Sequence, residues 1–210
     1  MSKEKNIPTF NIITLGNGGV GKSSIIKRYI NDLFDDNSLP TVGLAFSIKD
    51  IVLKDKKKVK LKLIDTGGQE KYRSLAKSYY KNADGVLFVY SIDDQSSFDH
   101  ITEWIESFKD NYDGKGVIPQ IIVESKNDLE RVVDKEISIK LAKEKGLDLI
   151  STSAKTNDKI EELFTKLAEE INENGKTRNG KQNSVKLKKN DSNKKKTICC
   201  IFKKEDLMDI

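Results

Sequence analysis

A glycine-rich stretch, GNGGVGKS from Gly16 to Ser23, has the residue types and spacing of a phosphate-binding loop. It follows the apolar run FNIITLG and precedes KSSIIKRYINDLF, whose apolar residues repeat at helical spacing. A phosphate chain needs several backbone N–H groups pointed at it, and glycines let the backbone curve that closely. We expect Lys22 to reach the β- and γ-phosphates, Ser23 to bind Mg²⁺, and the helix dipole to add to the attraction. The loop by itself does not distinguish ATP from GTP.

A second motif, DTGGQE from Asp65 to Glu70, follows the apolar run KVKLKLID. Asp65, at the carboxyl end of the expected strand, can orient the magnesium ion through a water molecule. The Gly68 N–H can bond the γ-phosphate, which would make this segment sensitive to that phosphate. Gln69 can orient a water molecule for in-line attack, so it is the predicted catalytic residue.

Two further short segments, SKND (125–128) and STSAK (151–155), can read a base. The Asp128 carboxylate can accept hydrogen bonds from both N1–H and the exocyclic amine of guanine, and adenine does not offer this pair. Adenine would be rejected because it would leave the Asp128 carboxylate buried and unpaired. The stem of Lys126 would cover the base, and the Ala154 N–H would meet the guanine O6. Each segment alone is a weak signal, but their order after two phosphate motifs indicates guanine.

Short apolar runs alternate with amphipathic segments between residues 10 and 172, which predicts a three-layer α/β sandwich with one antiparallel edge strand. Ligands of such sheets lie beyond the carboxyl ends of the strands. His100 and Trp104 lie one helical turn apart, and we expect both to pack in the core. The expected strands are 10–16, 44–53, 58–65, 85–92, 119–124 and 147–152, and the expected helices include 22–34, 96–112, 134–146 and 157–172.

Together the four motifs resemble the Ras superfamily of small GTPases over residues 10–172. TVGLAF and KYRSLAKSYYKNADGVLFVYSIDDQSSF are most similar to the Rab branch. The resemblance implies the α/β G domain of P-loop NTPases, a mostly parallel six-stranded sheet with one antiparallel edge strand and helices on both faces. It also implies that Thr41 in PTVG binds Mg²⁺ and senses the γ-phosphate, and that Phe34 packs edge-on against the base.

The same resemblance implies partners. An exchange factor, a GTPase-activating protein and effectors would bind switch I (about 38–46) and switch II (about 66–80), and the protein would be a monomer. Four positions, Ala45, Ile64, Gly67 and Ser125, depart from the Rab pattern. Ile64 and Ala45 replace a tryptophan and an acidic residue of the Rab interaction surface, Ser125 replaces an asparagine that bridges the base to the phosphate loop, and Gly67 replaces an alanine. We therefore expect faster nucleotide release than from a typical Rab.

Composition divides the chain into an N-terminal extension (1–9), the G domain (10–172) and a disordered basic tail (173–210). Eleven basic and five acidic residues lie in the tail, whereas the first 172 residues are close to neutral although the whole chain carries +5. Near-neutrality of the folded part argues against a nucleic-acid-binding domain. No apolar run approaches the roughly 18 residues of a membrane span, and no cysteine precedes the tail, so the cytoplasm is the expected compartment.

The only two cysteines, Cys199 and Cys200, follow three lysines. They are candidate lipidation sites that would hold the protein on the cytoplasmic face of a membrane together with the basic residues. CCIF would fit a prenylation pattern if the chain stopped at Phe202, but KKEDLMDI follows. Processing that exposes the cysteines, prenylation that tolerates the extension, S-acylation in place and two free thiols all remain open.

The sequence thus predicts a Rab-like switch that binds GTP and GDP with Mg²⁺, hydrolyses GTP slowly and acts in membrane trafficking. Two alternatives are a GTP-loaded scaffold with little hydrolysis and a P-loop kinase or ATPase; Gln69 and Thr41 argue against the first, and Asp128 against the second. The residues expected to bind the nucleotide are Gly16, Asn17, Gly18, Gly19, Val20, Gly21, Lys22, Ser23, Ser24, Phe34, Thr41, Asp65, Gly68, Ser125, Lys126, Asp128, Ser153, Ala154 and Lys155, with Ser23 and Thr41 as metal ligands.

Overall fold

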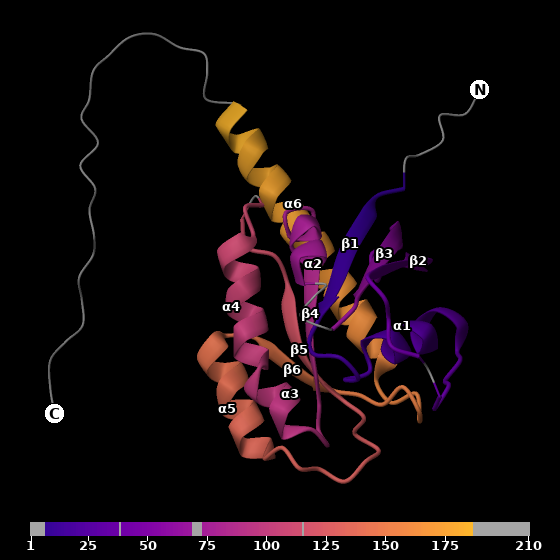
Figure 1. Ribbon diagram of the computed structural model, residues 1–210. Helices are drawn as coiled ribbons and strands as arrows, with labels where there is room; N and C mark the ends of the chain where they lie inside the picture. Colours follow the sequence, from indigo (N-terminus) through magenta and orange to yellow (C-terminus); the bar gives the residue numbers. More distant parts are fainter. Residues whose placement is uncertain (1–6, 38, 69–72, 115, 187–210) are drawn as a thin grey trace, which may run out of the picture. The chain divides into compact units, whose positions relative to one another are not determined.

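Six strands form one sheet in the order β2-β3-β1-β4-β5-β6 (Figure 1). Every neighbouring pair is parallel except β2 and β3, so the predicted mostly parallel sheet with one antiparallel edge strand is confirmed. This computed structural model describes residues 7–37, 39–68, 73–114 and 116–186. The strands are β1 (Thr9–Leu15), β2 (Leu44–Val52), β3 (Lys58–Thr66), β4 (Gly85–Ser91), β5 (Gln120–Ser125) and β6 (Asp148–Ser151).

Helices cover both faces of the sheet, and each face has its own apolar core. Side chains of α1 and α6, among them Tyr29 and Phe164, pack on one face. Side chains of α2, α3, α4 and α5, among them Tyr80 and Trp104, pack on the other. All seven residues of β4 are buried between these layers, which explains its unbroken apolar sequence. The helices are α1 (Lys22–Asn31), α2 (Arg73–Tyr80), α3 (Gln95–Asp99), α4 (Ile101–Asn111), α5 (Lys135–Lys145) and α6 (Ile160–Lys186).

Two helices differ from the prediction. The single helix expected over 96–112 is divided into α3 and α4, with His100 between them in an αR conformation (φ −82°, ψ −8°). Asp94 caps α3 by accepting a hydrogen bond from the Ser97 N–H, which starts the helix one residue before the predicted boundary. The spacing of apolar residues indicates neither the break at His100 nor the cap at Asp94.

Helix α6 runs on to Lys186, so the disordered tail expected from residue 173 is wrong for 173–186, whose backbone is helical. The stretch contains Gly175, Gly180 and several asparagines, which are poor helix formers, but it continues a packed helix, and adding a residue to an existing helix costs less than starting a new one. The chain divides after Gly175 into two units, Met1–Gly175 and Lys176–Ile210. No helix among the described residues has both the length and the apolar character required to cross a bilayer.

The carboxyl ends of the parallel strands bring the chemical motifs to one edge of the sheet. The pairing of Thr14 with Asp65 aligns the ends of β1 and β3. Ser91 pairs with Ser125, which aligns the ends of β4 and β5 in the same way. The loops that follow β1, β3, β5 and β6 therefore meet at this edge, as the fold class predicts.

A buried polar network fixes the loop that follows β5. Glu124 is 2% exposed, and both of its carboxylate oxygens accept hydrogen bonds from Arg131, each at 3.0 Å. The Tyr90 hydroxyl donates to the same carboxylate at 2.6 Å and lies 2.8 Å from the Ser138 hydroxyl of α5. Burial alone would raise the pKa of Glu124, but the hydrogen bonds from Arg131 and Tyr90 outweigh it and hold that pKa below its ordinary value.

Arg131→Met should lower the free energy of unfolding at pH 7 by about 3 kcal/mol, because it leaves a buried carboxylate without its cation. The loss should shrink as the pH falls toward 4. Wild-type protein loses the pair's contribution as the pH falls through the depressed pKa of Glu124, whereas the variant's buried Glu124 takes up a proton at higher pH and is relieved. Urea unfolding at several pH values measures both effects.

Lys145→Met is the matched control, since Lys145 pairs with the exposed Glu106 at 3.2 Å. Its effect should stay below about 1 kcal/mol. A loss in Arg131→Met that is equally small, or that does not change with pH, would contradict this role of the pair.

Candidate functional site: a nucleotide-sized cavity

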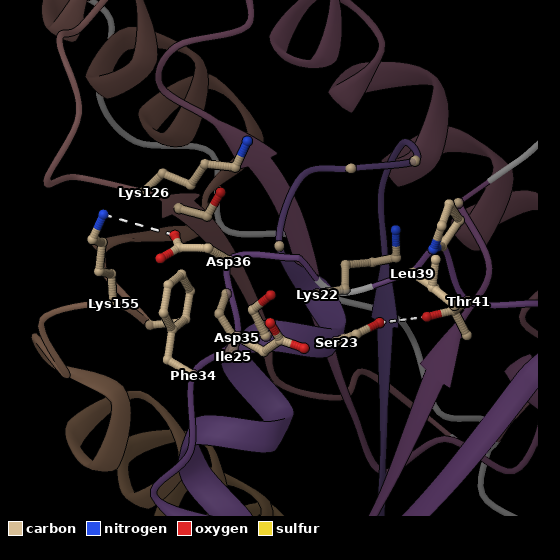
Figure 2. A pocket seen from close by; sticks show the side chains of 18 of the residues that line it. Lys22, Ser23, Ile25, Phe34, Asp35, Asp36, Leu39, Thr41, Lys126 and Lys155 are labelled. Atoms are coloured by element: carbon tan, nitrogen blue, oxygen red, sulfur yellow. Dashed lines mark hydrogen bonds and ion pairs between the residues drawn. The ribbon is translucent and has the colours of Figure 1, made fainter.

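A cavity of about 510 Å³ opens at the carboxyl edge of the sheet. Figure 2 shows Lys22, Ser23 and Thr41 toward one end and Phe34 with Lys155 toward the other. The cavity is lined by Gly18, Gly19, Gly21, Lys22, Ser23, Ser24, Ile25, Phe34, Asp35, Asp36, Leu39, Pro40, Thr41, Thr66, Gly68, Ser125, Lys126, Asp128, Leu129, Ala154 and Lys155. Residues from all four sequence motifs thus share one concave site.

The phosphate loop leaves β1 through a glycine that the fold requires. Gly16 has φ +147°, and a Cβ there would lie 2.0 Å from the Val89 carbonyl oxygen, so no other residue fits. The loop ends at the start of α1, where Gly21 is the N-cap and has no side chain to satisfy the helix N–H groups. Those N–H groups remain available to an anion, which the helix dipole also attracts.

Lys22 lies inside the curve of this loop and is only 5% exposed. Its Nζ donates hydrogen bonds to the Gly16 carbonyl at 2.8 Å and to the Asn17 carbonyl at 2.6 Å. Burial lowers the pKa of Lys22 to about 8, while the charge of Asp65 acts in the opposite direction. Its hydrogen-bond partners among the described residues are neutral carbonyls, and the nearby charge of Asp65 acts on it without a hydrogen bond.

Three oxygen-bearing side chains converge beside Lys22. The Ser23 hydroxyl lies 2.5 Å from the Thr41 hydroxyl and donates to Asp65 Oδ2 at 2.5 Å, and the Thr41 hydroxyl lies 3.4 Å from the same oxygen. Burial raises the pKa of Asp65, with Ser23 and Lys22 opposing. Asp65 Oδ1 is buried and has no hydrogen-bond partner among the described residues. An all-oxygen set with an unsatisfied buried carboxylate oxygen fits Mg²⁺, which prefers hard oxygen ligands.

The start of the expected switch II segment contacts both switch I and the phosphate loop. The Gly67 N–H donates to the Gly43 carbonyl at 2.8 Å. At Gly68, a Cβ would lie 2.2 Å from the carbonyl of Asn17 and 2.4 Å from the nitrogen of Gly18. Only glycine allows this approach, which places the Gly68 backbone at the phosphate end of the cavity.

The other end of the cavity carries the residues predicted to read guanine. The Ser153 hydroxyl donates to Asp128 Oδ1 at 2.5 Å and also accepts from the Thr156 N–H at 3.1 Å. Lys126 Nζ lies 3.6 Å from Asp93 Oδ1, which extends the lysine stem along the cavity wall. The Asp128 carboxylate and the Lys126 stem therefore both line the cavity.

Ser125 connects this end to the phosphate loop. Its hydroxyl lies 2.6 Å from the Val20 carbonyl and 2.9 Å from the Tyr90 carbonyl. A hydroxyl has one hydrogen, so it satisfies one of these carbonyls at a time and has none left for a base. An asparagine amide carries two hydrogens, so an asparagine at this position could donate to a carbonyl and to a base at the same time.

Sequence reasoning missed Arg28, which holds the STSAK segment from α1. Its Nε donates to the Ala154 carbonyl at 2.7 Å and its NH2 group to the Lys155 carbonyl at 3.3 Å. The contact joins residues 126 positions apart, so no local pattern could have indicated it. Asp36, which pairs with Lys155 at 3.7 Å, and Leu129 also line the cavity without having been predicted.

The structure brings together most, but not all, of the predicted residues. Predicted residues that contact or adjoin the site without lining the cavity are Gly16, Asn17, Val20, Asp65 and Ser153. Gln69, Cys199 and Cys200 lie outside the described residues. Trp104 is buried in the core as predicted, but both it and His100 also bond to Asn17, so packing is not their whole role.

Comparison with known proteins agrees with this geometry. The model of the Ras family matches residues 11–173. The chain is 34% identical over 196 residues to Ras-related protein SEC4 of Saccharomyces cerevisiae, covering 90% of each chain. It is 37% identical over 164 residues to Ras-related protein Rab-13 of Canis lupus familiaris, covering 77% of this chain and 79% of the relative.

A third relative, Ras-related protein Rab-8B of Pongo abelii, is 34% identical over 201 residues and covers 92% of this chain and 96% of its own length. The matched region includes all four sequence motifs and both segments expected to be switches. This chain belongs to the Ras family and is a Rab-like small GTPase.

Proposed function

We propose that this protein binds GTP and GDP together with Mg²⁺, hydrolyses GTP slowly and acts as a switch in membrane trafficking. The observation that carries the proposal is one cavity with the Lys22 ammonium toward one end and the Asp128 carboxylate beside Lys126 at the other. That pairing suits a guanine nucleotide, whose phosphates need a cation and whose base offers two N–H groups. The trafficking role rests on the similarity to Rab proteins.

At the phosphate end, Ser23 and Thr41 would hold Mg²⁺, and Asp65 would orient it through water. Mg²⁺, when bound, neutralises negative charge on the phosphates. Lys22 would exchange its two carbonyl partners for phosphate oxygens, and the Gly68 N–H would bond the γ-phosphate. Loss of that phosphate would then loosen Gly68 from the Asn17–Gly18 peptide and, through Gly67, from Gly43 of switch I.

Hydrolysis would need a water molecule held in line, and Gln69 is the residue we propose to orient it. Among the described residues that line the cavity there is no arginine. If an activating partner supplies that cation, the unaided rate would be lower by a factor of roughly 10³–10⁵. Exchange factors, activating proteins and effectors would bind the two switch segments, which line or adjoin the same cavity.

At the base end, the Asp128 carboxylate would accept from guanine N1–H and N2–H, with Ser153 holding its Oδ1 in place. Arg28 would fix the peptide after Ala154, so that the Ala154 N–H faces the guanine O6. We further propose that Cys199 and Cys200, with the lysines before them, attach the protein to the cytoplasmic face of a membrane by a lipid. One chain plus a basic patch is a sufficient combination for such attachment.

Protein purified without chelator should carry GDP, and Gln69→Leu should carry mostly GTP. The side chain acts on the water and hardly on the bound ground state, so affinity should stay within a few fold while single-turnover hydrolysis nearly stops. Nucleotide extraction with chromatography and single-turnover assays measure both quantities. GTP in the wild type would favour the scaffold alternative, adenine nucleotide would favour the ATPase alternative, and equal rates in the two proteins would remove Gln69 from catalysis.

Ser125→Asn should slow GDP release, by about fivefold if the added N–H gains one hydrogen bond of about 1 kcal/mol. The asparagine amide can bridge the Val20 carbonyl and the base at once, which the single hydroxyl hydrogen does not allow. Ser125→Ala should instead speed release, since the Val20 carbonyl loses its donor. Stopped-flow release of a fluorescent GDP analogue compares the three proteins, and an asparagine variant that releases GDP as fast as the wild type would show that Ser125 does not limit retention.

A further inference from the structure

The side chain of Asn17, in the phosphate loop, is held by two residues of the α3–α4 region. The Trp104 indole Nε1–H donates to Asn17 Oδ1 at 2.9 Å, and Asn17 Nδ2 lies 3.0 Å from His100 Nδ1. An indole N–H is only a donor, so it must face the carboxamide oxygen, and the amide NH₂ must then face the imidazole. His100 Nδ1 is therefore an acceptor, and the neutral ring carries its proton on Nε2.

The backbone of Asn17 is where three parts of the site meet. Its carbonyl accepts a hydrogen bond from Lys22 Nζ at 2.6 Å. The peptide between Asn17 and Gly18 faces Gly68, where a Cβ would come within 2.2 Å of the Asn17 carbonyl. A displacement of this one peptide would move a partner of the buried ammonium and open or close the contact with Gly68.

We propose that Trp104 and His100 are positioning residues that hold the Asn17–Gly18 peptide through the Asn17 carboxamide. Neither residue lines the cavity, so each acts on the nucleotide only through the loop. Trp104 is 2% exposed and packed in the core beneath the sheet, which makes it a rigid anchor. His100 sits at the junction of α3 and α4, so the helix pair is tied to the phosphate end of the site. The inference rests on the proposed function for its effect on the nucleotide, but its hydrogen-bond pattern can be measured without any nucleotide.

The chain offers matched probes because it contains one histidine and one tryptophan. In full-length wild-type protein, long-range ¹H–¹⁵N NMR of the single imidazole should show the Nε2–H tautomer at neutral pH. Asn17→Asp should reverse this by placing a proton on Nδ1, as the Nδ1–H tautomer or as the imidazolium that a neighbouring carboxylate favours, because a carboxylate accepts from both the indole and the imidazole. A side chain that merely packs would keep one tautomer in both proteins, so this reversal distinguishes positioning from packing.

Trp104→Phe keeps an aromatic ring in the core and removes the N–H, leaving Asn17 Oδ1 without that donor. GDP release should rise about fivefold, the equivalent of one lost hydrogen bond. Asn17→Ala, which removes the whole link and leaves the core intact, should give a similar rise even if Trp104→Phe folds poorly. Phe108→Leu is the control, because Phe108 is buried in the same helix α4 and packs in the same core; it should lower the melting temperature without changing GDP release or the tautomer.

An Nδ1–H tautomer in the wild type, no reversal in Asn17→Asp, or GDP release in Asn17→Ala equal to that of the wild type would each overturn the proposal. Failure of the proposed function is recognised separately, as a wild-type protein that binds no guanine nucleotide. In that case the tautomer measurements alone decide whether Asn17 is held as described.

Discussion

A buried lysine ammonium is the constraint on which the phosphate end of the structure depends. Lys22 is almost inaccessible to water, and burial lowers its pKa to about 8. Two backbone carbonyls stabilise the charge in the structure, and they can do so only because Gly16 lets the loop curve around the amine. Neutral carbonyls compensate a buried charge less well than an anion does, so the fold holds a cation that a phosphate chain would stabilise further.

The same constraint links the two segments that we propose as switches. Asn17, whose carbonyl is one of the partners of Lys22, also contacts Gly68, while Gly67 bonds to Gly43. Thr41, in the expected switch I segment, contacts the Ser23 hydroxyl and the Asp65 carboxylate beside Lys22. A ligand that changes the environment of Lys22 would therefore act on both proposed switch segments at once, through contacts of less than 4 Å rather than through a long-range pathway.

The fold and the main motifs of the site could be predicted because both depend on short patterns of neighbouring residues in the sequence. Glycines at fixed spacing, a carboxylate at the end of an apolar run, and the alternation of strands and helices are all consequences of backbone geometry. The six strands appear where the apolar runs predict them, and each strand begins and ends within one residue of the prediction. The cavity contains the predicted lysine, serine and aspartate together.

The supporting contacts could not be predicted, because they join residues that only the tertiary fold brings together. Arg28 reaches Ala154 across 126 positions, and Trp104 reaches Asn17 across 87. Glu124 ends a predicted strand and Arg131 follows in a charged loop, but no local pattern shows that the two form a buried pair. The helical continuation of α6 to Lys186 depends on propagation from a packed helix, which apolar periodicity does not measure.

Calorimetry of GDP binding to the nucleotide-free, full-length protein with Mg²⁺ tests the role of Lys22 most directly. Because burial lowers the pKa of Lys22 to about 8 and phosphate would raise it, GDP binding at about pH 8.5 should take up protons. At about pH 7 the amine is already charged, and uptake should be near zero. Titrations in two buffers with different ionisation enthalpies give the number of protons, and Lys22→Arg, which stays charged, should show no uptake at either pH. Equal proton uptake by wild type and Lys22→Arg at about pH 8.5 would contradict the account, because Lys22 would then not be the buried partner of the phosphates.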